Sequence, residues 1–335
     1  MDGRQVFRDA AVKTEFLERW DEIAGEVKAR QGGLEGLDSL PVGKATEVVE
    51  RIADGMYEPG SQGGLEAIIE RFARPVYLVQ WSSFVVPPDS FPNSEEIHSK
   101  LNSAGVMLQT RLPSAGRIDL RHHRLGWVGT GWMVAEDIVV TNRHVAHEFA
   151  ADQNGRFAFR RNFGRPPVRA SVDWCHEFGQ SDESVFRVVE VLWIEPDDSV
   201  DVALLRIETH GEDEQPAPIP IALMTQEELA AAGVGTWVAV VGCPAQDSRN
   251  DAADQQRIFD GIYNVKRLAP GKVTAVVGTD LLHHDATTLG GNSGSVILDL
   301  ATGKAIGLHY GGIEGLRNEA VQAPRIQQVL QKFLD

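Results

Sequence analysis

Apolar side chains in the first 75 residues recur every three or four positions, which is the spacing of helices that lie with one face on a core. Three such stripes occupy residues 12–27, 48–56 and 65–72. The second stripe ends near Glu58-Pro59-Gly60 and the third before Pro75, because proline and glycine interrupt helices. The pattern therefore predicts a helical N-terminal extension over residues 1–75.

The pattern changes at residue 76, where the run VYLVQWSSFVV (76–86) predicts a β-strand. Prolines interrupt the chain after this run. A short helix is predicted to begin near Ser94, because Glu95 and Glu96 would stand in its first turn, at the positive end of the helix dipole. We expect residues 76–116 to form a connecting segment that packs on the domain that follows.

From about residue 117 the chain becomes a series of short apolar runs separated by turn residues. These runs lie at 126–134, 137–141, 188–194, 201–207, 237–242, 272–278, 295–300 and 304–311. Few helical patterns intervene, so the sequence predicts a mainly β barrel or sandwich rather than alternating strands and helices. At the end of the chain, Ile326, Val329, Leu330 and Phe333 share one side of a predicted C-terminal helix.

The composition narrows the possible functions. The 335 residues are 42% hydrophobic and 24% charged, and the formal net charge is −16. This acidic balance argues against nucleic acid or an anionic membrane as the main partner. The sequence shows no signal-peptide pattern and no apolar run long enough to cross a bilayer, and its two cysteines make no disulfide framework. We therefore expect a cytoplasmic protein.

Imidazole and carboxylate groups are metal ligands, so His283, His284 and Asp285 form a possible metal site. A second ligand cluster at suitable spacing is missing from the sequence. No cofactor is therefore expected.

Three short stretches carry the residue types of nucleophilic catalysis. His144 follows an apolar strand in VVTNRHVA, Asp201 heads the apolar run DVALLRI, and Ser293 lies between polar and glycine residues in GGNSGSVILD. A serine hydroxyl is a poor nucleophile at neutral pH and needs a base with a pKa near 7, which histidine supplies. A partly buried aspartate would fix the tautomer of that histidine and stabilise its protonated form. The sequence therefore predicts a triad of these three residues.

The glycines around Ser293 have a chemical reason. Backbone N–H groups must crowd around a reacting oxygen, where side chains would be in the way. The N–H groups of Gly291 and Ser293 are predicted to form this oxyanion hole. The loop lacks the sharp strand–turn–helix setting of esterases, so a hydrolase that is not a peptidase is disfavoured.

The blocks TNRHVA, DVALL and GNSGS occur in the order His, Asp, Ser, and together they resemble the chymotrypsin-like serine peptidases. The resemblance covers roughly residues 117–335. It implies two six-stranded β-barrels, with His144 and Asp201 from the first barrel, Ser293 from the second, and the triad in the cleft between them. It also implies a serine endopeptidase that acts on protein or peptide substrates.

The stretch TTLGGNSGS followed by IGLHYGG is similar to the bacterial glutamyl endopeptidase group. This resemblance implies that Thr288 and His309 hydrogen-bond an acidic side chain at P1, the residue before the cleaved bond. Tyr310 and Gly311 would pair with the substrate backbone. A hydroxyl and an imidazole also suit a carboxylate or an amide better than a long cation. Glutamate is favoured at P1, and glutamine and other residues stay open.

Two departures from the family bear on activation. Asn292 stands where chymotrypsin has an aspartate that pairs with a freed amino terminus, so activation by cleavage at Arg117-Ile118 is not expected. In secreted glutamyl endopeptidases the mature amino terminus helps to neutralise the P1 acid, but here a long extension precedes the first barrel. Either the extension is removed, or the charge is supplied otherwise, for example by protonated His309.

The extension also suggests regulation, because an unrestrained peptidase in the cytosol would be harmful. Residues 1–75 are expected to keep the enzyme latent or to dock a regulatory protein. The alternative function is a peptide-binding module that uses the same fold without cleaving. The three triad residues and the oxyanion glycines argue against this alternative.

Overall fold

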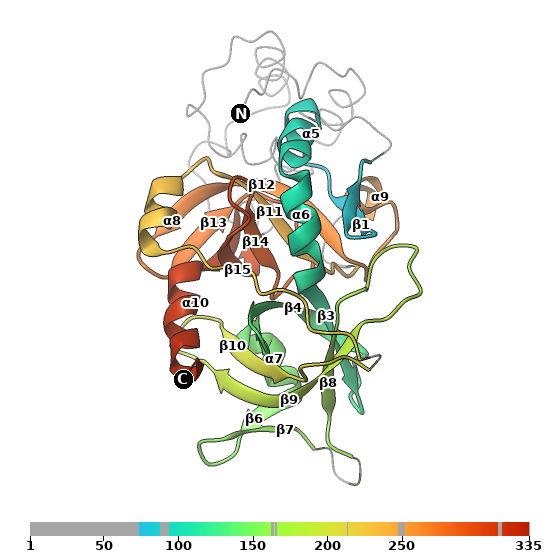
Figure 1. Cartoon of the computed structure of the whole chain (residues 1–335), viewed down its shortest axis with the longest axis vertical. Helices are drawn as coiled ribbons and strands as arrows, with labels where there is room; N and C mark the ends of the chain where they lie inside the picture. Colours follow the sequence, from blue (N-terminus) through green and yellow to red (C-terminus); the bar gives the residue numbers. More distant parts are fainter. Residues whose placement is uncertain are drawn as a thin grey trace, which may run out of the picture.

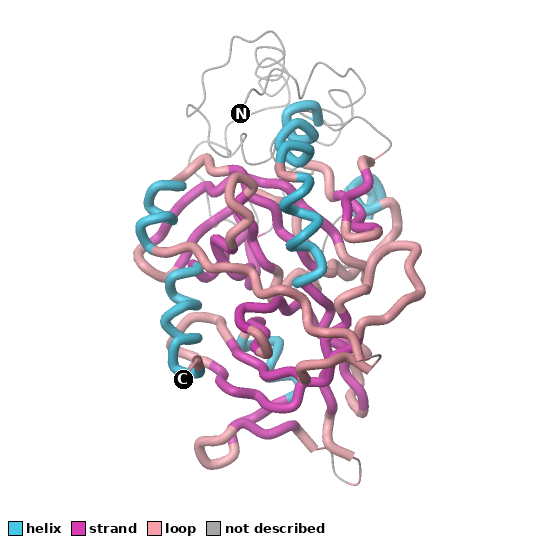
Figure 2. Tube along the Cα trace, in the orientation of Figure 1, coloured by secondary structure: helices cyan, strands magenta, loops and turns pink. Residues whose placement is uncertain are grey.

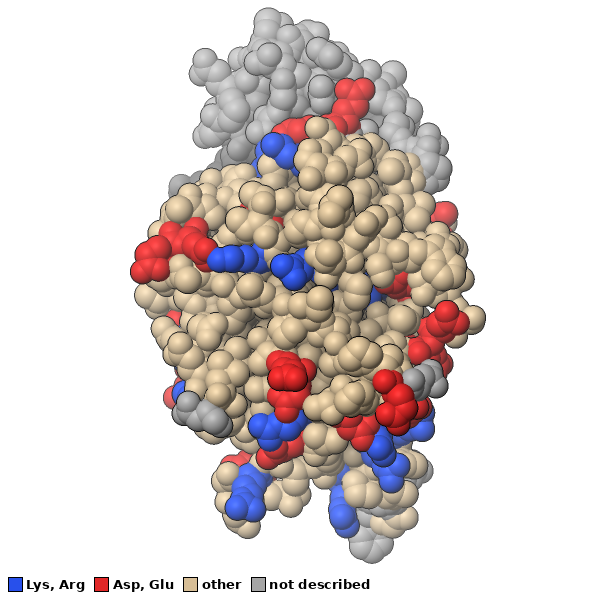
Figure 3. Space-filling view, in the orientation of Figure 1, with Lys and Arg blue, Asp and Glu red and all other residues tan. Residues whose placement is uncertain are grey.

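The computed structural model describes residues 74–87, 94–161, 164, 166–212, 214–246, 252–313 and 317–334. The three helices predicted before residue 73 lie outside the described residues. The described chain is mainly β, with two strand-rich bodies stacked along the long axis of the molecule and most helices at the outside (Figures 1 and 2). Acidic and basic side chains lie next to one another over the face drawn in Figure 3.

Six antiparallel strands close the first barrel, in the order β10-β5-β4-β3-β8-β9. The strands are β3 (Ala115–Arg121), β4 (Trp127–Ala135), β5 (Ile138–Thr141), β8 (Arg169–Asp173), β9 (Val185–Ile194) and β10 (Ala203–Ile207). Apolar side chains fill its interior, and Ile118, Val139 and Leu205 are fully buried there. A separate hairpin, β6 (Ala150–Asp152) and β7 (Phe157–Phe159), extends from this barrel at the bottom of Figure 1.

The second barrel closes in the order β11-β14-β15-β16-β13-β12, with β11 pairing again with β12. Its strands are β11 (Trp237–Gly242), β12 (Arg267–Val277), β13 (Leu281–His284), β14 (Val296–Asp299), β15 (Ala305–Ile313) and β16 (Arg317–Gln322). A further buried cluster lies between the barrels and combines Trp132 and Leu204 of the first with Val241 and Leu298 of the second. The predicted double six-stranded barrel is therefore confirmed.

The run at residues 76–86 is a hairpin and not the single strand that its pattern predicts. Strands β1 (Tyr77–Gln80) and β2 (Ser83–Val85) pair with each other, and β1 also pairs with β12 of the second barrel. Trp81 and Ser82 form the turn, both with φ of +54°, a backbone conformation that hydrophobic patterning does not reveal.

Helices cover the outside of the barrels (Figures 1 and 2). The described helices are α5 (Ser94–Ser103), α6 (Gly105–Arg111), η1 (Leu112–Ser114), α7 (Arg143–Phe149), α8 (Gln226–Ala232), α9 (Ala252–Phe259), α10 (Ala323–Leu330) and η2 (Gln331–Phe333). α5 begins at Ser94 as predicted, and α10 lies where the C-terminal helix is predicted. Leu101 of α5, Leu108 of α6 and Ile326 of α10 are fully or almost fully buried in the cluster between the barrels.

Candidate active site

The first barrel brings His144 and Asp201 together through the pairing of two strands. β5 ends at Thr141, which pairs with Ala203 at the start of β10. The chain after β5 turns at once into α7, so His144 stands in the first turn of a short helix, directly opposite Asp201. Asn142 reinforces this corner, because its buried amide donates a hydrogen bond to the carbonyl of Asp201 at 2.9 Å.

Asp201 accepts two hydrogen bonds from His144. Its Oδ2 is 2.6 Å from the ring Nδ1, and its Oδ1 accepts from the backbone N–H at 3.0 Å. The carboxyl side chain is 15% exposed and the imidazole 49% exposed. The carboxylate must receive a proton from Nδ1, so the neutral imidazole keeps its lone pair on the exposed Nε2. This is the tautomer that a general base requires.

Ser293 lies in a glycine loop that is fixed to both barrels. Its carbonyl accepts from the N–H of Thr130 on β4, and the next residue, Gly294, donates to the carbonyl of His309 on β15. Gly294 has φ of +87°, and a Cβ there would collide with the carbonyl oxygen of Thr130. The close approach of the two barrels at this point therefore requires glycine.

The N–H groups of this loop divide into two kinds. Asn292, Gly294 and Ser295 each donate to a backbone carbonyl. The N–H groups of Gly291 and Ser293 have no backbone acceptor within the described part of the chain. These two donors are therefore available to an oxygen atom that binds beside Ser293.

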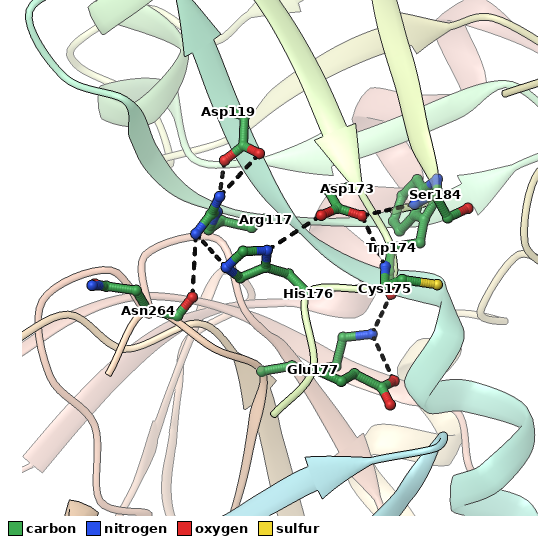
Figure 4. A network of polar contacts seen from close by, with 10 residues as sticks. Arg117, Asp119, Asp173, Trp174, Cys175, His176, Glu177, Ser184 and Asn264 are labelled. Carbon is green, nitrogen blue, oxygen red and sulfur yellow. Dashed lines mark hydrogen bonds and ion pairs between the residues drawn. The ribbon is translucent and has the colours of Figure 1, made fainter. Parts of the chain in front are cut away.

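A tryptophan from the first barrel supports Gly291. The backbone of Gly291 approaches Trp127 so closely that a Cβ would stand 2.5 Å from Cη2 of the ring. The guanidinium of Arg117 lies over the same ring, 5.6 Å from its centre. Figure 4 shows Arg117 contacting His176, which in turn lies 3.2 Å from Asp173. Through Arg117, this polar network is in contact with the tryptophan that packs on the serine loop.

The positions that bear on the activation route of chymotrypsin, Arg117-Ile118 and Asn292, are held within the folded barrels. Arg117 and Ile118 lie within β3, paired on both sides with β4 and β8, and Ile118 is fully buried. Asn292 is also buried, and its Oδ1 is 3.4 Å from the hydroxyl of Ser295. The position next to Ser293 is thus held by a local contact.

His309 is 3% exposed, and its Nδ1 lies 3.2 Å from Nε2 of the fully buried His284. Burial, and then the nearby His144, lower the pKa of His309 to about 3. His309 is therefore neutral at physiological pH. Burial thus opposes the expectation that protonated His309 neutralises a P1 acid, because a buried ring loses the water that would stabilise its charged form.

Thr288 lies in the segment that follows β13, and a polar residue that the sequence analysis missed holds it. Its hydroxyl donates to Oδ1 of Asn318 at 2.7 Å, and Nδ2 of Asn318 donates to the carbonyl of Ala286 at 2.6 Å. Asn318 lies on β16, whose polar sequence RNEAVQ gives little strand signal. His284, the buried partner of His309, is not marked as a site residue by the sequence either, beyond its place beside a second histidine.

Tyr310 and Gly311 lie at the end of β15 next to the serine loop. The pairing of β14 with β15 ends at Leu308, whereas β15 continues to Ile313 along β16. The hydroxyl of Tyr310 donates to Glu319 of β16 at 3.0 Å. A Cβ on Gly311 would have nothing within 4 Å, so the space around this glycine is open.

The described residues contain no group of three or more His, Cys, Asp or Glu side chains that could hold a metal ion. They also contain no helix that is long and apolar enough to span a membrane. The two barrels thus supply a histidine paired with a carboxylate, and a serine loop in which two N–H groups have no backbone acceptor among the described residues. Serine hydrolases use such groups.

The comparisons with known proteins agree with this class. Residues 129–308 match the family model of the trypsin-like peptidase domain. The chain is also 31% identical over 279 residues to a protein from Lysobacter enzymogenes named as a probable serine protease, covering 76% of this chain and 70% of that protein. The protein therefore belongs to the trypsin-like serine peptidases and is a peptide-bond hydrolase.

Solved structures show a more distant likeness. A serine endoprotease from Yersinia pestis aligns with 74% of this chain and 67% of its own, at 16% identity and a TM-score of 0.45. The inactive form of the Rv3671c protease aligns with 70% of this chain and 96% of its own, at 20% identity and a TM-score of 0.41.

Proposed function

We propose that the protein is a serine endopeptidase that cleaves peptide bonds through an acyl-enzyme on Ser293, with His144 as general base and Asp201 as its orienting carboxylate. The pair of hydrogen bonds from His144 to Asp201 is the observation that carries this proposal. These bonds leave Nε2 as the acceptor nitrogen of the His144 ring, whose side chain is about half exposed. The position of Ser293 at the junction of the two barrels supports its role as the nucleophile.

In this mechanism, Oγ of Ser293 attacks the carbonyl carbon of the substrate while Nε2 of His144 takes its proton. The resulting oxyanion accepts hydrogen bonds from the N–H groups of Gly291 and Ser293. His144 then gives the proton to the leaving amine, and the carbon–nitrogen bond breaks to leave an ester on Ser293. Water, activated by the same histidine, hydrolyses that ester and restores the enzyme.

The substrate backbone is proposed to lie along Tyr310 and Gly311, where β15 continues past the end of β14. Strand addition of this kind supplies affinity without side-chain choice. The P1 side chain is proposed to be glutamate, bound by Nε2 of His309 and by the hydroxyl of Thr288, which would turn from Asn318 to the carboxylate. The neutral state of His309 makes its remaining N–H a hydrogen-bond donor and not a counter-ion.

The protein is further proposed to act in the cytoplasm and to stay latent until a partner or processing releases it, with residues 1–75 as the regulatory or docking part. The division into an extension, a connecting segment at 76–116 and a peptidase domain at 117–335 stays part of this proposal. Removing residues 1–73 should raise the rate of peptide cleavage. Arg74 is retained in this truncated protein because its buried side chain pairs with Asp285. An unchanged rate in a folded truncated protein would contradict latency.

Labelling by a fluorophosphonate tests the mechanism, because this probe reacts with activated serines only. We expect wild-type protein to be labelled and Ser293→Ala to stay unlabelled. Ser103→Ala, which changes an exposed serine of α5, is the matched control and should be labelled like the wild type. Absence of labelling in the wild type and in the truncated chain would favour the peptide-binding module instead.

A further inference from the structure

The two proposed oxyanion donors are separated by one peptide group of the serine loop, the one that joins Gly291 to Asn292. The N–H of Gly291 belongs to the peptide before it, and the N–H of Ser293 belongs to the peptide after it. Gly290 and Gly291 carry no Cβ, so steric repulsion within the chain does not fix the orientation of these peptides. Contacts with the rest of the protein must fix it.

The two outer peptides are held by backbone hydrogen bonds. The carbonyl of Gly290 accepts from the N–H of Ala245 at 2.6 Å, and the carbonyl of Asn292 accepts from the N–H of Ser295 at 2.9 Å. In a trans peptide, the C=O group and the N–H group that follows it point in opposite directions. Each hydrogen bond therefore directs the N–H of the next residue, an oxyanion donor, away from the bonded carbonyl.

The middle peptide is held by a side chain. The carbonyl of Gly291 accepts a hydrogen bond from the hydroxyl of Thr130 at 3.1 Å. The same hydroxyl accepts from the backbone N–H of Cys243 at 3.1 Å. A backbone N–H can only donate and a carbonyl can only accept, so the single hydroxyl proton must lie toward Gly291. Thr130 and Cys243 are both fully buried, so water does not compete for these two bonds.

The backbone of Thr130 is tied to both halves of the candidate site. Thr130 lies on β4, its N–H donates to the carbonyl of Ser293 at 2.9 Å, and its carbonyl accepts from the hydroxyl of Thr141 at 2.8 Å. Thr141 ends β5, and the chain then leads directly to His144. The backbone contacts of Thr130 survive a change of its side chain. The hold of its hydroxyl on Gly291 can therefore be removed separately.

We propose that Thr130 is a positioning residue whose hydroxyl, by holding the carbonyl of Gly291, keeps the two N–H groups of the oxyanion hole in their binding orientation. The inference rests on the proposed function, because it needs an oxyanion beside Ser293. Thr130 is fully buried, so it acts through the loop and not on the substrate itself. Without the hydroxyl, the carbonyl of Gly291 loses this donor, and rotation about the glycines moves the N–H of Gly291. An oxyanion forms in both acylation and deacylation, so both steps depend on this contact.

The test uses the full-length protein and a peptide that the wild type cleaves, chosen by profiling peptides with different P1 residues. Thr130→Val removes the hydroxyl and keeps the branched shape of the side chain, whereas Thr130→Ser keeps the hydroxyl. Thr236→Val is the matched control. The hydroxyl of Thr236 also donates to a backbone carbonyl, that of Ala232 at 2.6 Å, but Thr236 precedes the start of β11, whereas Cys243 follows its end. Reactive serines are counted by fluorophosphonate labelling carried to completion, so that kcat is expressed per reactive serine.

We expect kcat per reactive serine to fall about tenfold to a hundredfold in Thr130→Val, a smaller loss than outright removal of an oxyanion donor causes. KM should be nearly unchanged, because the substrate carries no oxyanion before the reaction. Thr130→Ser and Thr236→Val should keep the kcat of the wild type.

A peptide trifluoromethyl ketone of the same sequence gives a second readout. Oγ of Ser293 adds to its carbonyl carbon, the serine proton passes to His144, and the carbonyl oxygen becomes an oxyanion in the hole. The affinity for this ketone should fall in Thr130→Val by the same factor as kcat/KM, because the adduct resembles the transition state.

The outcomes separate this inference from a structural role and from the proposed function. A purely structural role would lower Tm or the number of reactive serines, but leave kcat per reactive serine and the ketone affinity unchanged; that result overturns the inference and leaves the peptidase mechanism standing. An equal loss of kcat in Thr236→Val also overturns it, since the loss of any such hydroxyl would then slow the enzyme. If neither the wild type nor the chain without residues 1–73 is labelled, the proposed function fails and the inference fails with it.

Thr130→Ala provides an independent arm in case Thr130→Val does not fold. Thr130→Ala and Thr130→Ser differ by one oxygen atom, so the ratio of their kcat values isolates the hydroxyl in a smaller side chain. Thr130→Ser should again be faster, by about tenfold to a hundredfold per reactive serine. Equal values of kcat in these two variants overturn the inference, because the presence of the hydroxyl would then make no difference to the oxyanion.

Discussion

Replacing Gly291 by alanine perturbs the proposed oxyanion loop at a glycine whose surroundings leave no room for a side chain. Gly291 has φ of +89°, a left-handed conformation that is unfavourable for an L residue by about 1–2 kcal/mol. A Cβ would also stand 2.5 Å from the carbonyl oxygen of Cys243 and 2.5 Å from the ring of Trp127. Both neighbours are fixed, one by the backbone and one by packing. The loop must therefore shift and move the N–H of residue 291 away from its position.

Loss of one oxyanion donor typically lowers kcat by about 10²- to 10³-fold. We expect a loss of that size in Gly291→Ala, with a small change in KM, measured with a peptide substrate and with the rate of fluorophosphonate labelling. Gly235→Ala is the matched control, because Gly235 has the same φ of +89° and nothing within 4 Å of its Cβ. It should lose about 1–2 kcal/mol of stability, seen as a Tm lower by a few degrees, with unchanged kcat.

The reasoning would be refuted by a Gly291→Ala protein whose kcat stays within about tenfold of the wild type, since its N–H would then not serve the oxyanion. It would also be refuted if Gly235→Ala lost as much activity. Backbone strain in general, and not the position of the loop, would then control the rate.

Three further predictions follow from buried polar contacts. Asp201→Asn should lower kcat by roughly 10⁴-fold without unfolding the protein, because an amide favours the wrong tautomer of His144; activity and circular dichroism would check this. Lys266→Met should lower the free energy of unfolding in urea by about 3–5 kcal/mol. Lys266 is fully buried, and its loss leaves the carboxylate of Glu177, 3.4 Å away, without its cation. A decrease below about 1 kcal/mol would contradict this prediction. Burial opposes ionisation of Asp173, but its hydrogen bonds outweigh burial and lower its pKa. The carboxylate therefore stabilises the fold at pH values above its pKa in the unfolded chain, and this stabilisation is lost as the pH falls through its pKa in the folded protein. In Asp173→Asn, Tm should depend less on pH in the acid range, and an unchanged dependence would refute this role of Asp173.

The fold could be predicted from the sequence where apolar residues are continuous. β5 reads IVVT and β14 reads VILD, and both are buried along their whole length. β8 (RASVD), β13 (LLHH) and β16 (RNEAVQ) were not predicted, because their polar residues are satisfied by neighbouring strands and loops that pattern reasoning does not place. Each of them pairs with a neighbouring strand on both sides in the closed barrel, and these long-range pairings are not visible in the local sequence.

The candidate site also contains residues that the sequence predicts and residues that it does not. His144, Asp201 and Ser293 could be singled out because each stands at the end of an apolar strand or in a glycine loop, where chemistry leaves a local signature. Arg74 and Asp285 are 211 positions apart, and no local pattern marks either of them. What joins them is the closure of the second barrel, which brings β13 and its following segment against the start of the described chain. The residues proposed for the chemistry can thus be predicted from short motifs. An ion pair between segments that are far apart in the sequence becomes visible only in the folded barrel.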